Sequence, residues 1–106
     1  MKPILALAVS LSFAAPALAA ETSLHGTYDG SAEDLRVRLA DAITLYFKRY
    51  DGHVDSEGVG HASYGGDSVT VTLDVADGRH YVLTVTAAKH DTRYTSKWAD
   101  ALRARL

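Results

Sequence analysis

The chain of 106 residues contains no cysteine. This absence excludes a disulfide framework, a thiol nucleophile and any zinc site built from cysteine side chains. It also excludes a lipid-modified anchor of the kind that is attached to a cysteine after a cleaved leader. Small exported domains often depend on disulfides. The stability of this domain must therefore come from packing and hydrogen bonding.

Basic residues are missing from the middle of the chain. The formal net charge is −2, and residues 51–78 contain six acidic residues and no lysine or arginine. Residues 79–106, in contrast, contain six basic and two acidic residues. A nucleic-acid-binding domain needs a basic patch that displaces counterions, so this composition excludes that class of partner. The acidic and basic segments are expected to face each other in the fold; the alternative is a field that steers a ligand.

A hydrophobic run long enough to span a membrane is missing as well. The apolar stretch 4–15 carries no charge but is shorter than the ~20 residues that a transmembrane helix needs. Lys2 precedes it, Pro16 follows it, and residues 17–19 are small at the positions that a signal peptidase reads. The sequence predicts a cleavable signal peptide over 1–19, which leaves 87 residues in the periplasm or outside the cell with no stable membrane anchor. The alternative interpretation is a buried N-terminal helix.

Hydrophobic periodicity predicts two helices in the remainder. Ser31 is followed by acidic residues in the manner of an N-terminal cap, and apolar side chains then recur at helical spacing over 32–50. A second apolar stripe at helical spacing predicts a helix over about 93–105.

Alternating apolar and polar residues predict strands over 59–64, 69–75 and 81–87, with a further short strand if 24–28 is extended. A two-residue turn at 65–66 sets His61 opposite Thr70, and a three-residue loop at 76–78 sets Asp74 opposite His80. The predicted architecture is an α+β two-layer sandwich. In it, a three-stranded antiparallel meander, or a four-stranded one with 24–28, carries two helices on one face in the order (β)-α-β-β-β-α. Residues 31–106 are predicted to form a single domain, preceded by a polar segment or short strand over 20–30.

The polar face of this predicted sheet is the first candidate binding surface. Its side chains are His61, Ser63, Thr70, Asp74, His80 and Thr84. Because both helices are expected on the other face, these side chains are free to contact a protein or a small ligand in the periplasm. Histidine also changes charge near neutral pH, which makes a pH sensor conceivable. The alternative is an ordinary solvated, threonine-rich face.

A second candidate is an acidic loop in which Asp51, His53, Asp55 and Glu57 alternate with other residues. In an extended segment, residues two apart point the same way, so these four side chains would converge on one Zn, Cu or Ca ion. An EF-hand is excluded because Ser56 and Ala62 stand where that loop needs glycine and glutamate.

Catalytic motifs are missing: the sequence contains no nucleophile elbow, no paired zinc histidines on a helix and no phosphate loop. The sequence therefore predicts a small exported, non-enzymatic binding module without a cofactor, acting through a sheet face or edge. A periplasmic divalent-metal-binding protein is the alternative, followed by a small hydrolase. The oligomeric state is left open.

Overall fold

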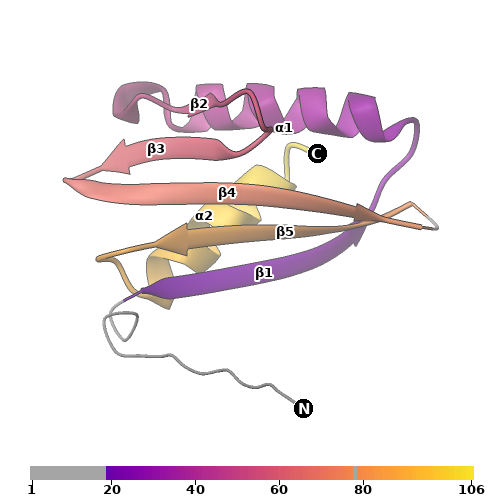
Figure 1. The fold of residues 1–106 in the computed structure, drawn as a ribbon. Coiled ribbons are helices and arrows are strands. Elements are labelled where there is room, and N and C mark those ends of the chain that lie inside the picture. The colour runs from indigo at the N-terminus through magenta and orange to yellow at the C-terminus, as the bar shows by residue number, and fades with distance from the viewer. Residues whose placement is uncertain (1–18, 78) are drawn as a thin grey trace, which may run out of the picture.

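The protein forms a two-layer α+β fold in which two helices cover one face of an antiparallel sheet (Figure 1). The structure, a computed structural model, describes residues 19–77 and 79–106. The predicted signal peptide therefore lies outside the described residues except for Ala19. The elements are β1 (Ala20–Thr27), α1 (Ala32–Tyr46), the 3-10 turn η3 (Lys48–Tyr50), β2 (His53–Val54), β3 (Gly60–Tyr64), β4 (Asp67–Ala76), β5 (His80–Ala87) and α2 (Thr92–Arg103). No helix in the described part of the chain is long and apolar enough to cross a membrane.

The α+β class is confirmed, but the predicted strand count is wrong. The sheet has five strands in the order β1-β5-β4-β3-β2. β1 is longer than the strand predicted over 24–28 and pairs with β5 along its whole length. β2 was missed because it pairs with β3 through only two residues, which is too short for alternation to show.

The first hairpin forms as predicted. Gly65 and Gly66 connect β3 to β4 with φ angles of 57° and 81°. Two consecutive positive φ angles are what a two-residue turn of the right twist requires, and glycine adopts them at little cost. The turn sets His61 opposite Thr70, as expected.

The second hairpin has a different register from the predicted one. Ala76 pairs with His80, so the three-residue loop is 77–79, and Asp74 lies opposite Val82. The predicted Asp74–His80 pair is therefore wrong. A shift of two residues leaves every side chain on its expected face, so alternation cannot distinguish the two registers.

Both helices begin at side-chain caps. The Ser31 hydroxyl accepts a hydrogen bond from the N–H of Asp34 at 3.0 Å, which confirms the predicted cap of α1. In α2 the Asp91 carboxylate accepts from the N–H of Arg93 at 3.0 Å.

The end of the first helix differs from the prediction. α1 stops at Tyr46 and tightens into η3 instead of continuing to residue 50. The carbonyl of Phe47 accepts from the N–H groups of both Tyr50 and Gly52. A side chain at position 52 would lie 2.6 Å from the carbonyl oxygen of Ile43. The chain therefore reverses closely against the helix, which only glycine permits.

One hydrophobic cluster joins the two layers. Helix residues such as Leu35, Ile43 and Trp98 pack with strand residues such as Val71 and Leu83, and each of these five is at most 2% exposed. The apolar sides of β3, β4 and β5 thus face both helices. Their polar sides face away from the helical layer.

Candidate functional site

The six residues predicted for the first candidate surface lie on one face of the sheet, opposite the helices. They are His61 and Ser63 on β3, Thr70 and Asp74 on β4, and His80 and Thr84 on β5. Among the described residues, no helix covers this face (Figure 1). We call it the open face.

The two strands that the sequence did not reveal in full enlarge the open face. On β1, the Ser23 hydroxyl lies 2.9 Å from that of Thr84, which places Ser23 and its alternate neighbour His25 there. On β2, the ring of His53 stacks on the ring of His61, with 5.4 Å between the ring centroids. Four of the five histidines therefore share the open face. No lysine or arginine of the described strands points to it.

A shallow hollow of about 510 Å³ marks one end of the open face, where β1, β5 and the end of β4 meet. Its lining residues are His25, Gly26, Thr27, Ala76, His80, Tyr81 and Val82. The hollow thus brings two of the four histidines to one concave place. Sequence reasoning could not find it, because His25 belongs to a strand whose pairing with β5 the alternation pattern did not reveal.

The second candidate, the acidic loop, is not extended as the metal hypothesis assumed. Asp51 has a φ of 57°, and only His53–Val54 form a strand. The Asp55 carboxylate is used within the loop: it accepts from the N–H groups of Glu57 and Val59, and lies 2.7 Å from Nε2 of His61. The four predicted ligands therefore do not converge. In residues 19–77 and 79–106, no three His, Asp or Glu side chains are grouped to hold a metal ion.

Asp55 gives the loop a pH dependence that can be measured. The hydrogen bond from His61, followed by those from Val59 and Glu57, lowers the pKa of Asp55 to about 2 from an ordinary value of 3.8. Because the folded pKa is depressed, this stabilisation is present above about pH 4 and is lost as the pH falls through 2. We expect Asp55→Asn to melt below wild type at pH 5, and the gap between the two melting temperatures to close between pH 4 and 2. A gap that stays constant over this range would contradict the assignment.

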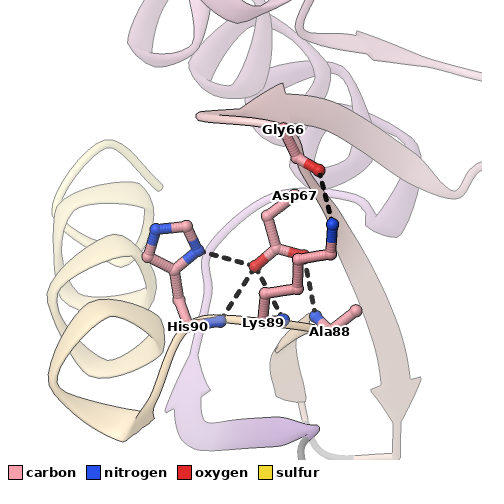
Figure 2. Close-up of polar contacts among 5 residues, drawn as sticks. All are labelled: Gly66, Asp67, Ala88, Lys89 and His90. Atoms are coloured by element: carbon pink, nitrogen blue, oxygen red, sulfur yellow. Dashed lines mark hydrogen bonds and ion pairs between the residues drawn. The ribbon is translucent and has the colours of Figure 1, made fainter.

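A third cluster, which the sequence analysis missed, lies where β4 begins (Figure 2). The side chain of Asp67 is fully buried and accepts hydrogen bonds from the N–H groups of Ala88, Lys89 and His90 at 2.9–3.1 Å. Its Oδ2 also lies 2.6 Å from Nδ1 of His90. This single carboxylate therefore fixes the loop that leads from β5 into α2.

The protonation state of this cluster follows from its hydrogen bonds. Burial acts to raise the pKa of Asp67, but the bonds from the His90 ring and from the three backbone N–H groups outweigh it and lower the pKa. The ionised carboxylate can only accept, so Nδ1 of His90 donates to it. The sequence does contain a signal for this cluster. The alternation of β4 continues backward to place Asp67 on the apolar face, where a carboxylate requires donors.

The Asp67–His90 pair resembles half of a catalytic arrangement, because a buried carboxylate orients one ring nitrogen and leaves the other pointing away (Figure 2). However, no serine or threonine hydroxyl of the described residues hydrogen-bonds to His90. The ring instead packs against the rings of Tyr64, Tyr94 and Trp98, with 4.6–5.6 Å between ring centroids. The contacts of this pair are those of a structural element that holds the loop between β5 and α2 in place.

No protein-family model, curated protein or solved structure matches this chain. The geometry of the described residues is therefore the basis for assigning a function.

Proposed function

We propose that this protein is a small exported binding module that holds its partner, a protein or a small ligand, on the open face. The observation that carries this proposal is the composition of a face left uncovered by the described residues. It combines hydroxyl groups from four strands with four histidines, and its strands contribute no lysine or arginine. Such a face offers many donors and acceptors without long flexible side chains whose ordering would cost entropy.

Export rests on the arrangement of residues 1–19, and the start of the sheet supports it. β1 begins at Ala20, directly after the predicted cleavage site. Cleavage there would leave every strand of the sheet intact. The proposed compartment is the periplasm or the exterior.

The carboxylates on and beside the open face set its charge. Glu21 on β1 and Asp74 on β4 lie on this face, and the carboxylate of Asp55 lies beside His61. Because the described strands contribute no lysine or arginine, the open face is net negative at neutral pH.

Site-specific photo-crosslinking tests the proposal. A photoreactive amino acid replaces Thr84 in the centre of the open face or, as the matched control, the exposed Thr44 on α1. We expect discrete adducts from position 84 in the producing cell and none from position 44. Intact-mass measurement detects a protein and a small ligand alike.

A second variant makes the result specific to the face. Thr72 lies opposite Thr84, and Thr72→Arg adds a long cation beside it. We expect Thr72→Arg to reduce the adduct yield by about tenfold while leaving the fold intact. Equal adducts from both positions, or a yield that Thr72→Arg leaves unchanged, would show that the open face is not the binding surface.

A further inference from the structure

The two edges of the sheet are built differently. One edge is β2, which has only two residues and packs beside α1. The other edge is β1, which runs for eight residues in unbroken register with β5. Proteins usually protect an exposed edge with lysine, proline, a bulge or a very short strand. β2 follows this practice, whereas β1 has none of these features.

The unpaired backbone groups of β1 can be assigned from the ladder. The N–H of Tyr28 donates to the carbonyl of Arg79, in the same register that joins β1 to β5. Because antiparallel residues alternate in the direction of their hydrogen bonds, the even-numbered residues of β1 bond to β5. The odd-numbered residues direct their N–H and C=O groups outward. These are Glu21, Ser23, His25 and Thr27.

We propose that β1 pairs in antiparallel fashion with β1 of a second copy of this chain, about a twofold axis at Leu24. This register sets Ser23 opposite His25 of the second copy, and Glu21 opposite Thr27. Each of the four outward residues then exchanges both backbone groups with a residue of the other copy. A register shifted by two residues in either direction sets one of the four opposite a residue outside β1.

The side chains support a second copy as the occupant. On the helix side, half-buried Leu24 meets Leu24 of the second copy and extends the core across the axis. On the open face, Glu21 lies diagonal to His25 of the second copy, and neither residue faces its own kind. Like charges are therefore never directly opposed. The edge is self-complementary, which a twofold interface requires.

The dimer joins the two sheets into one and places both open faces on the same side. It does not depend on the proposed function, since an edge can pair whether or not the open face binds a partner. Because the contact is one strand pair, we expect a weak, reversible dimer with a Kd on the order of 100 µM.

Sedimentation velocity of the purified protein up to about 1 mM, with two substitutions at one position, tests this pairing. Ser23→Pro removes an outward N–H without removing a bond to β5, and edge strands tolerate proline at such a position. Ser23→Ala keeps the N–H. We expect wild type and Ser23→Ala to dimerise alike, and Ser23→Pro to stay monomeric with an unchanged far-UV circular dichroism spectrum. A monomeric wild type, or a folded Ser23→Pro variant that still dimerises, would overturn the proposal.

Hydrogen exchange of the wild type covers the case in which Ser23→Pro fails to fold. The amides of Glu21, Ser23, His25 and Thr27 should become more protected as the concentration rises, while exposed amides elsewhere stay unchanged. If these four amides exchange at the same rate in a sample that sedimentation shows to be dimeric, the dimer forms elsewhere and the proposal is wrong. The crosslinking test at position 84 probes binding at the open face and is independent of the dimer test.

Discussion

Replacing Asp67 by alanine is expected to lower the free energy of unfolding by about 3 kcal/mol, or the melting temperature by roughly 15 °C. The substitution leaves the N–H groups of Ala88, Lys89 and His90 without their acceptor. It also removes the carboxylate that holds the His90 ring. Urea denaturation at neutral pH measures the loss.

Lys89→Ala is the matched control in the same loop. Among the described residues, the Lys89 ammonium group makes only a long, exposed bond of 3.4 Å to the carbonyl of Gly66 (Figure 2). Its removal should therefore change stability by less than about 0.5 kcal/mol. Because the pKa of Asp67 is lowered in the folded state, the contribution of this carboxylate is present above its ordinary pKa of 3.8. It is lost as the pH falls further. The gap between wild type and Asp67→Ala should therefore narrow below about pH 4. If wild type and Asp67→Ala are equally stable at neutral pH, the cluster does not hold the loop in place.

Trp98→Ala is expected to cost about 3–5 kcal/mol, the largest effect of any single truncation that we predict. Trp98 is 2% exposed. Its ring packs against four others, with 5.1–5.9 Å between ring centroids: those of Phe47, Tyr64, His90 and Tyr94. Removing it opens a cavity where α2, β3 and the end of α1 meet. Urea denaturation followed by circular dichroism is the measurement, because Trp98 is the only tryptophan and fluorescence would be lost with it.

Two further substitutions provide a comparison for the loss of stability expected from Trp98→Ala. Trp98→Phe keeps part of the aromatic contact and should recover about half of the loss. The neighbouring Lys97 is exposed, so Lys97→Ala should be nearly neutral. A loss below about 1 kcal/mol for Trp98→Ala would mean that the aromatic cluster can collapse around the vacated space.

The candidate binding surface was partly predictable. Alternation in β3, β4 and β5 identified which side chains point away from the helices, since a strand has a period of two residues and one of its faces must be buried. The contributions of His25 and His53 were not predictable in the same way. They depend on which strands become neighbours, and β1 joins β5 across more than fifty residues of intervening chain.

The sequence by itself determined the features that depend on neighbouring residues: the cap at Ser31, the glycine turn at 65–66 and the two faces of β3, β4 and β5. Tertiary structure alone decided the register of the second hairpin, because registers two residues apart satisfy the same alternation. It also decided that Asp67 would be paired, because its donors come from a loop that lies beside it only after β4 and β5 have paired. Local patterns record which side of an element is buried. They do not record which distant element supplies the contacts on that side.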